Sequence, residues 1–238
     1  GGNVRLVADN EADILLGLIN AGNGSGDVSL VAERSILDNN GASLNVRADA
    51  LRMVADATVA FNADGTDNFS LGGDGVGIIG GSATGNGTPA ININAIDTQV
   101  TTLAAQSADG IYVLEADGLT VAATLDISVS QVNFNSTTTP RTDASLSDLT
   151  TTDNGVIKLQ STLGNITLNE GDDADDITVS AHGSGNVLIQ TLAADGDIIV
   201  NSNSDPAHIV SGSGHVTLNA GDDIDLNANI QTGSTGTV

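Results

Sequence analysis

The sequence predicts an all-β protein built as a parallel β-helix (β-solenoid), on three observations. A short phrase of glycine, a small or polar residue and then alternating aliphatic and polar residues recurs along the chain. No 3.6-residue hydrophobic period persists over any long stretch, which argues against helices. Aromatic residues make up 2% of the 238 residues and tryptophan is absent, so the expected core is a thin one of Val, Ile, Leu and Ala.

The recurring phrase has the period-two alternation of short, half-buried strands. Copies of it begin at Gly2, Gly26, Gly164, Gly185, Gly196 and Gly214, and the phrase starts again at Gly236. Further strands are expected between the copies, at 176–179 and 223–226. The distances from Gly2 to Gly26, from Gly164 to Gly185 and from Gly214 to Gly236 predict a repeat of about 20 to 25 residues, which is typical of stacked repeat architectures.

The stretch 49–60 comes nearest to a helical pattern, with the sequence DALRMVADATVA. Leu51, Met53 and Val59 also fit strict alternation, and we therefore expect strands there.

Two regions in the middle of the chain are less regular. We expect one elongated domain spanning 1–238, with an irregular Gly-rich region at 72–89 and a polar loop at 136–153.

The charge balance excludes several classes of partner. The chain has 30 acidic and 6 basic side chains, for a formal net charge of −24. Nucleic acids and anionic membrane surfaces need clustered Lys and Arg, so we expect neither as a partner. No apolar run approaches the length of a membrane span, so no membrane insertion is expected. There is no cysteine, which excludes disulfides and thiolate chemistry.

Two acidic turns are candidate calcium sites. Calcium takes about six to eight oxygen ligands, and several carboxylates on one flexible turn can supply them. Stacking of the repeats would bring the two turns onto the same edge of the solenoid. The alternative is that they are ordinary solvated turns, because Asp bonds readily to its own backbone. The candidate metal ligands are Asp172, Asp173, Asp175, Asp176, Asp222 and Asp223.

Enzymatic chemistry has little support in the sequence, and we assign no catalytic or cofactor-binding residue. A glycosidase needs paired carboxylates in a cleft, usually with aromatic platforms, and this chain has one tyrosine and three phenylalanines. A lyase of the β-helix type would need Arg or Lys to stabilise an enolate, and only Arg141 and Lys158 follow residue 52. A carbohydrate-active β-helix enzyme, acting through Asp172, Asp173 or Lys158, stays open as an alternative.

In phrases such as GHVTLNAGDDIDLNANIQTGSTGTV, GDVSLVAERSIL and AAQSADGIYVLEADGLTV, the chain resembles the giant secreted adhesins of Gram-negative bacteria. These are filamentous-haemagglutinin-like proteins with degenerate β-helix repeats. The resemblance covers about two thirds of the chain and excludes the Gly-rich region. It implies a right-handed parallel β-helix, secretion to the cell surface and a segment of a longer protein. It carries over no catalytic residue.

From these observations we expect a structural or adhesive segment of an extracellular bacterial surface protein. Solenoid ends expose strand edges and apolar core, so the expected partners are neighbouring repeats or a second copy, with end-to-end stacking into filaments. Surface glycans are a further expected partner. A calcium-dependent carbohydrate-binding module is the remaining alternative, and calcium is the one cofactor considered.

Overall fold

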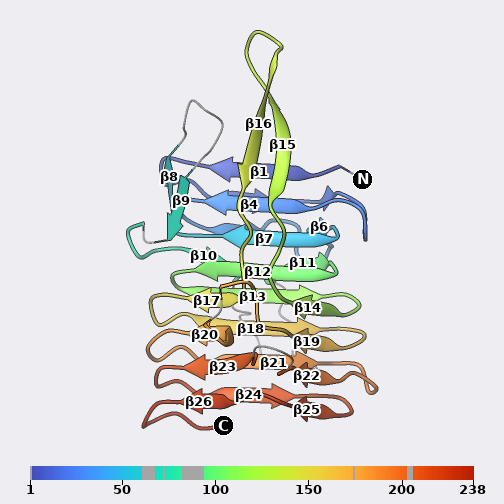
Figure 1. Ribbon diagram of the computed structural model, residues 1–238, viewed down its shortest axis with the longest axis vertical. Helices are drawn as coiled ribbons and strands as arrows, with labels where there is room; N and C mark the ends of the chain where they lie inside the picture. The colour runs from blue at the N-terminus through green and yellow to red at the C-terminus, as the bar shows by residue number, and fades with distance from the viewer. Residues whose placement is uncertain (1, 61–67, 72, 82–93, 174, 203–205) are drawn as a thin grey trace.

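The computed structural model describes residues 2–60, 68–71, 73–81, 94–173, 175–202 and 206–238. The described residues form strands and turns and contain no helix, which confirms the all-β class. With no helix among them, these residues include no helical membrane span. The strands lie across the long axis, with the two chain ends at opposite ends of the molecule (Figure 1).

The first sheet, sheet A, is 12-stranded and begins with four continuous strands. These strands, in stacking order, are β1 (Val4–Ala8), β4 (Val28–Ala32), β7 (Ala50–Val54) and β12 (Thr102–Ser107). Beyond β12 the sheet divides into two columns of shorter strands. One column is β14 (Leu119–Val121), β19 (Ile166–Leu168), β22 (Ile198–Val200) and β25 (Ile224–Leu226). The other is β17 (Leu149–Thr151), β20 (Ile177–Ala181), β23 (His208–Ser211) and β26 (Ile230–Thr232).

The second sheet, sheet B, is 10-stranded and has the reverse arrangement. It begins as two columns: β2 (Ile14–Leu16), β5 (Ile36–Asp38) and β10 (Ile78–Ile79), and β3 (Ile19–Asn20), β6 (Val46–Arg47) and β11 (Ile96–Gln99). Both columns meet β13 (Gly110–Glu115), which is followed by the continuous strands β18 (Val156–Ser161), β21 (Val187–Thr191) and β24 (Val216–Asn219). The pairs described in both sheets are parallel, an arrangement consistent with the predicted β-solenoid or β-helix.

The core consists of aliphatic ladders along the stack. Ile166 and Ile198 are register partners on neighbouring strands, and both are fully buried, which confirms the inward orientation that alternation predicts. One cluster of buried residues extends from Ile14 in β2 to Val216 in β24. Because each strand contributes only a few inward side chains, aliphatic residues fill the space and large rings are not needed.

The repeat predicted from glycine spacing is partly wrong. Val4 pairs with Val28, and Val216 N–H donates to Thr237 O, so the Gly2–Gly26 and Gly214–Gly236 repeats stack as expected. The copies at Gly164 and Gly185, however, lead into strands of different sheets. Ile166 pairs with Ile198, so Gly164 lies against Gly196 instead. Glycine allows close backbone approach at more than one corner, and the phrase therefore marks entry into either sheet.

The strands expected within 49–60 are confirmed by β7 and β8 (Ala57–Ala60). β8 pairs antiparallel with β9 (Asn68–Leu71). Half of the Gly-rich region 72–89, residues 72 and 82–89, lies outside the described residues, and its described part includes β10 (Ile78–Ile79). The range 136–153, expected as a polar loop, contains two strands. β16 (Thr138–Asp143) pairs with β15 (Ile127–Val132) in an antiparallel hairpin, and β17 pairs with β12 and β20 in sheet A.

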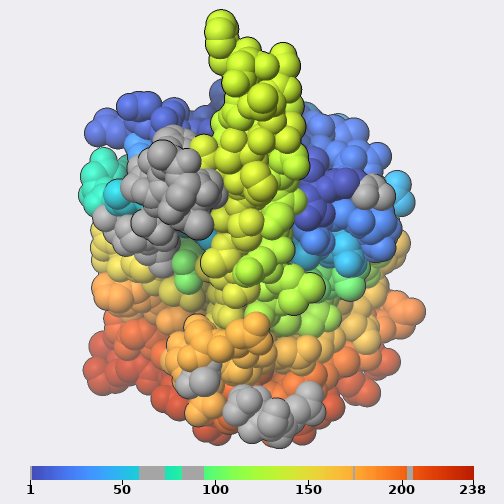
Figure 2. Space-filling view, turned by 45° about the horizontal axis from the view of Figure 1, so that its top comes forward, coloured from blue at the N-terminus to red at the C-terminus, as the bar shows by residue number. Residues whose placement is uncertain are grey.

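This β15–β16 hairpin belongs to a long insert, residues 122–148, between the two columns of sheet A. The hairpin runs across β12, β7, β4 and β1 and projects past the N-terminal end of the stack (Figure 1). In Figure 2 it forms a yellow-green ridge standing out from the surface. Leu146 packs against Val31, Val54 and Ala104, which creates a second, smaller apolar cluster under the insert.

A buried polar network also fixes the insert to sheet A. Asp143 accepts hydrogen bonds from Arg5 Nε at 2.8 Å and from Ser29 Oγ at 2.6 Å. Arg52 Nε donates to the carbonyl of Ala144 at 3.0 Å. Burial lowers the pKa of Arg52, while the nearby Asp143 carboxylate opposes this shift. Arg5, Ser29 and Arg52 are register neighbours on β1, β4 and β7, so the Asp143 carboxylate and the Ala144 carbonyl together bond to a whole row of outward side chains.

Candidate functional site

The most distinctive polar cluster contains Asp148, Asp173 and Asp175. One carboxylate oxygen from each residue lies within 4.8 Å of the other two, with Asp148 buried and the other two side chains exposed. Asp148 is the last residue of the insert, directly before β17. Asp173 and Asp175 belong to the connection between β19 and β20. The cluster thus joins two successive layers of sheet A at the break between its columns.

The fold brings these segments together through register and close backbone packing. Leu149 of β17 pairs with Val179 of β20, so the chain before each strand reaches the same corner. Asp172 N–H donates to Ser147 Oγ at 2.9 Å. Gly171 packs so closely on Ser147 that a Cβ at position 171 would overlap its side chain. The connection between β19 and β20 is therefore held directly against the end of the insert.

The Asp148 carboxylate has unusual surroundings. Its residue is 3% exposed, and its buried Oδ1 atom has no hydrogen-bond partner. Burial raises the pKa of Asp148 to about 8, and the negative charges of Asp173, Asp175 and Glu170 contribute in the same direction. Thr178, whose hydroxyl is also buried without a partner, precedes the register partner of Leu149. Both the carboxylate and the hydroxyl are oxygen donors suited to a hard cation.

A second acidic cluster contains Asp197, Asp222 and Asp223 at the corner where the chain enters β22 and β25. Both oxygens of its half-buried member, Asp197, already accept hydrogen bonds. Asp197 Oδ1 accepts from Asp223 N–H at 3.1 Å, and Asp197 Oδ2 accepts from Asn165 Nδ2 at 3.2 Å. Asn165 Oδ1 in turn accepts from Asp197 N–H at 2.9 Å. This row of Asn and Asp side chains connects successive layers without a cation.

The structure therefore separates the six predicted calcium ligands. It brings Asp173 and Asp175 to Asp148, and Asp222 and Asp223 to Asp197, while Asp172 and Asp176 belong to neither cluster among the described residues. The expectation that both turns share one edge is wrong. Asp223 precedes β25 at one corner, whereas Asp173 follows β19 at another. The two turns have similar composition, and only the register of the stacked strands distinguishes their corners.

Sequence reasoning missed the least exposed member of each cluster, the buried Asp148 and the half-buried Asp197. Each is a single Asp far along the chain from the acidic turn that it joins. The available signal was that the polar residues Asp148 and Thr178 each precede an inward aliphatic residue, Leu149 or Val179. Recognising that these two positions are neighbours requires the register between β17 and β20. The insert hides that register, because it separates β17 from the rest of its layer.

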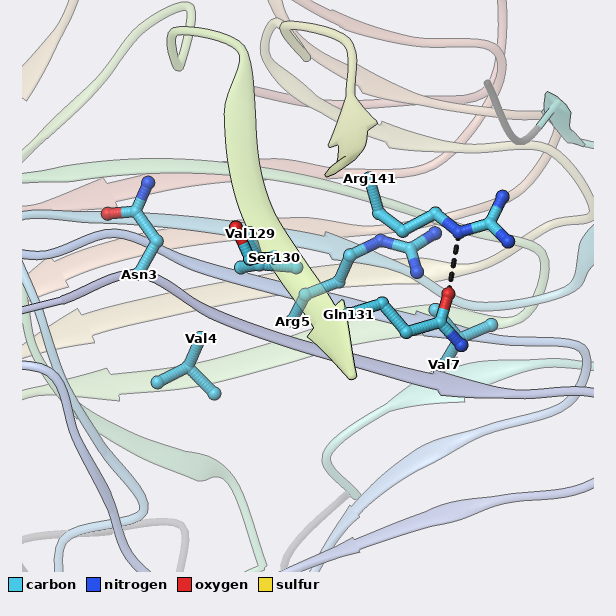
Figure 3. Close-up of a pocket in the computed structure, with 8 residues that line it drawn as sticks. All are labelled: Asn3, Val4, Arg5, Val7, Val129, Ser130, Gln131 and Arg141. Atoms are coloured by element: carbon cyan, nitrogen blue, oxygen red, sulfur yellow. Dashed lines mark hydrogen bonds between the residues drawn. The ribbon is translucent and has the colours of Figure 1, made fainter. Parts of the chain in front are cut away.

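An open cavity of about 500 Å³ lies between β1 and the hairpin. Figure 3 shows Arg5 extending from β1 beneath the hairpin, with Arg141 and Gln131 on the hairpin itself. Arg141 Nε donates to Gln131 Oε1 at 2.6 Å. The lining residues are Asn3, Val4, Arg5, Val7, Val129, Ser130, Gln131 and Arg141. The mixture of amide, hydroxyl and guanidinium groups suits a polar ligand.

The C-terminal end of the stack has a hollow of different character. It measures about 280 Å³ and is almost wholly aliphatic. Ile224 and Leu226 occupy inward ladder positions, opposite Ile198 and Val200, yet both remain about half exposed. The lining residues are Val216, Thr217, Leu218, Ile224, Leu226, Ile230 and Val238. Among the described residues, β24, β25 and β26 are each paired along one side only.

No protein-family model, no curated protein and no solved structure matches this chain. The resemblance to filamentous-haemagglutinin-like adhesins therefore stays a prediction from the sequence. Any function must be argued from the geometry of the stack and its surfaces.

Proposed function

We propose that the chain is a structural or adhesive segment of a secreted bacterial surface protein, built as a right-handed parallel β-helix that stacks end to end. The aliphatic hollow at the C-terminal end carries the proposal. There the ladder of Ile166, Ile198 and Ile224 continues to the last layer with its final member half exposed. Another layer of the same kind would bury these side chains and pair the open strand edges.

The expected occupant of this end is a further β-helical layer, either from neighbouring repeats or from a second copy. Strand edges offer regularly spaced backbone donors and acceptors, and the hollow between them offers apolar area. A layer with inward Val, Ile or Leu side chains satisfies both requirements at once. The formal charge of −24 favours ordered end contacts over side-by-side association, because the sides of such rods repel one another.

Sedimentation velocity over a concentration series, with negative-stain electron microscopy, tests this proposal. We expect concentration-dependent rods or filaments whose length grows in steps of one chain. Leu226→Lys should weaken association at least about tenfold, because it places a charge in the end contact. Leu125→Lys, at an exposed position on the insert, is the matched control and should associate normally. Single short rods at every concentration, or equal association of both variants, would refute end-to-end stacking.

An adhesive role has a separate supporting observation. Phe134 at the tip of the β15–β16 hairpin is fully exposed, beyond the polar cavity that contains Arg141 and Gln131. An exposed ring on the same hairpin as amide and guanidinium groups is suited to surface glycans. On a glycan array, Phe134→Ala should reduce binding, whereas Leu163→Ala, an exposed aliphatic residue elsewhere, should leave it unchanged. Equal loss in both variants, or no bound glycan, would exclude the hairpin tip as the adhesive surface.

This proposal assigns no catalytic role. The rival hypothesis, a carbohydrate-active enzyme, predicts release of sugar ends from a polysaccharide and loss of that activity in Asp173→Asn or Lys158→Ala. Incubating the chain with a polysaccharide panel distinguishes the two. Activity that disappears in these variants would replace the structural proposal with the enzymatic one.

A further inference from the structure

The buried carboxylate of Asp148 lacks the partners that buried charges normally have. Within the described residues no Lys, Arg or His side chain pairs with Asp148, and its Oδ1 atom has no hydrogen-bond donor. An ionised carboxylate in such a place is strongly unfavourable unless a cation or donors compensate it. Asp148 therefore needs either a bound proton or a bound cation.

The positions of Asp173 and Asp175 favour a cation. A proton on Asp148 would allow one hydrogen bond to one neighbouring carboxylate and would leave the other carboxylates repelling each other. A divalent ion placed among the three would contact every carboxylate, since their oxygens lie within 4.8 Å of one another. The unpartnered Oδ1 atom would then have the partner that it lacks.

We propose that Asp148, Asp173 and Asp175 bind a calcium ion. The donors are all carboxylate oxygens, which excludes a preference for the softer metals that favour sulfur and imidazole. Two of the three ligands lie on an exposed connection, and calcium tolerates such irregular, partly hydrated geometry better than magnesium does. Water at the two exposed ligands is available to complete the coordination shell.

The matched reference is the cluster of Asp197, Asp222 and Asp223. It holds the same number of carboxylates within the same distance, but the oxygens of Asp197 already accept hydrogen bonds from Asp223 N–H and Asn165 Nδ2. Its other two carboxylates are exposed to water. This second cluster therefore needs no ion, and its acidic residues are suitable controls for non-specific cation effects.

A calcium ion at Asp148 would fasten the insert to the layer below it. Asp148 ends the insert, while Asp173 and Asp175 belong to the following connection, where Asp172 N–H already bonds to Ser147 Oγ. The ion would add a cross-link between segments that otherwise repel each other. This inference does not depend on end-to-end stacking, because the site lies on the side of the molecule.

Isothermal titration of the complete, chelator-treated chain with CaCl₂ tests the proposal, with MgCl₂ at equal ionic strength as the comparison. We expect one calcium ion per chain and a calcium-dependent rise in melting temperature that exceeds the rise with magnesium. Asp148→Asn should weaken calcium binding at least about tenfold, since loss of even an outer-shell partner commonly has this effect. Asp223→Asn, with the same loss of charge, should change calcium affinity less than about twofold.

A second variant keeps the test decisive if Asp148→Asn folds poorly. Asp173 is exposed, so Asp173→Asn should fold normally, as judged by circular dichroism, and should also lose calcium binding. Equal responses to calcium and magnesium, in the native chain and in all three variants, would mean that divalent ions only screen the negative charge. Calcium binding that survives in Asp148→Asn and Asp173→Asn would likewise overturn the proposal.

Discussion

The two halves of the stack interrupt opposite sheets. In the N-terminal half sheet A is continuous and sheet B is divided into two columns, whereas beyond β12 and β13 the division passes to sheet A. The chain crosses these divisions between β5 and β6 and between β10 and β11 in sheet B, and between β14 and β17, β19 and β20, and β22 and β23 in sheet A. The location of each division therefore decides which face of the molecule carries loops, inserts and polar clusters.

The divisions also differ in how they satisfy buried polar groups. In sheet B, Asn45 Nδ2 donates to Asp38 Oδ1 at 2.9 Å and to Leu16 O at 3.2 Å, while Asn45 Oδ1 accepts from Asp97 N–H at 2.8 Å. In sheet A, Asp148 occupies the break with several carboxylates around it and no donor on Oδ1. An amide can satisfy both donors and acceptors, whereas a carboxylate only accepts. At the first break the Asn45 amide bonds to groups on both sides, although the neighbouring Asp97 Oδ2 is buried without a hydrogen-bond partner. The second break requires a proton or a cation at Asp148.

Despite these differences, the halves share one core, and substitution in it should have the largest effect. Ile166→Asp buries an uncompensated carboxylate and should destabilise the chain by about 4 kcal/mol or more. Ile199→Asp, on an outward position of the neighbouring strand β22, is the control and should cost less than about 1 kcal/mol. Urea unfolding measures both values. Hydrogen exchange that rises in the C-terminal half alone would show that the halves unfold independently.

The insert lies against sheet A of the N-terminal half. Substitution of the residue that anchors it there should have the next largest effect on stability. Asp143→Ala leaves Arg5 without its buried carboxylate and should cost about 3 to 5 kcal/mol. Limited proteolysis should then cut the hairpin faster than in the native chain. Asp9→Ala removes an exposed carboxylate and should leave both stability and cleavage rate unchanged. A hairpin equally resistant in both variants would mean that the Leu146 packing alone fixes the insert.

Substitutions at the two breaks should change the stability of the chain in opposite directions in the absence of calcium. Asn45→Ala removes donors from buried acceptors and should destabilise the chain by about 1 to 3 kcal/mol. Asp148→Asn replaces a buried carboxyl that, without a cation, must take up a proton on folding, and it should raise the melting temperature of chelator-treated protein. Thermal unfolding with chelator compares them directly. Destabilisation by both substitutions would show that Asp148 is satisfied without an ion and would remove the contrast between the breaks.

The stability of the chain should depend on pH through Glu115, which lies at the junction between the halves. Glu115 ends β13, where burial raises its pKa from 4.5 to about 8. Between these two pH values the folded state keeps a proton that the unfolded chain has lost. The free energy of unfolding should therefore fall as the pH rises through this window, by at most about 1.4 kcal/mol per pH unit for one group. Asp97, with a pKa raised to about 7, contributes in the same direction.

Urea unfolding from pH 5 to pH 9 measures this dependence, and Glu115→Gln should make it shallower. Glu33→Gln, a substitution of a half-buried Glu away from the junction, serves as the control and should leave the slope as in the native chain. Equal slopes in all three proteins would show that Glu115 does not hold its proton near neutral pH.

Local patterns in the sequence were enough to predict the strands and the inward residues. Alternation gave the orientation of Ile166 and Ile198 correctly, and it identified strands within 49–60 against a competing helical pattern. The prediction of a polar loop at 136–153 failed where Thr138–Asp143 pairs with β15, because the pairing partner of a polar strand is not encoded in its own alternation.

The sequence by itself determined the class of fold, because the side-chain period of a strand is local and its aliphatic residues must be buried. Only the tertiary structure decided which copies of the glycine phrase stack, which sheet is interrupted in each half, and which carboxylates meet. Gly164 and Gly185 have similar surroundings in the sequence yet lead into different sheets. Asp148 meets Asp173 and Asp175 only through the register of β17 with β20, which depends on how each insert is accommodated. Register is a property of strand pairs, and no single segment carries it.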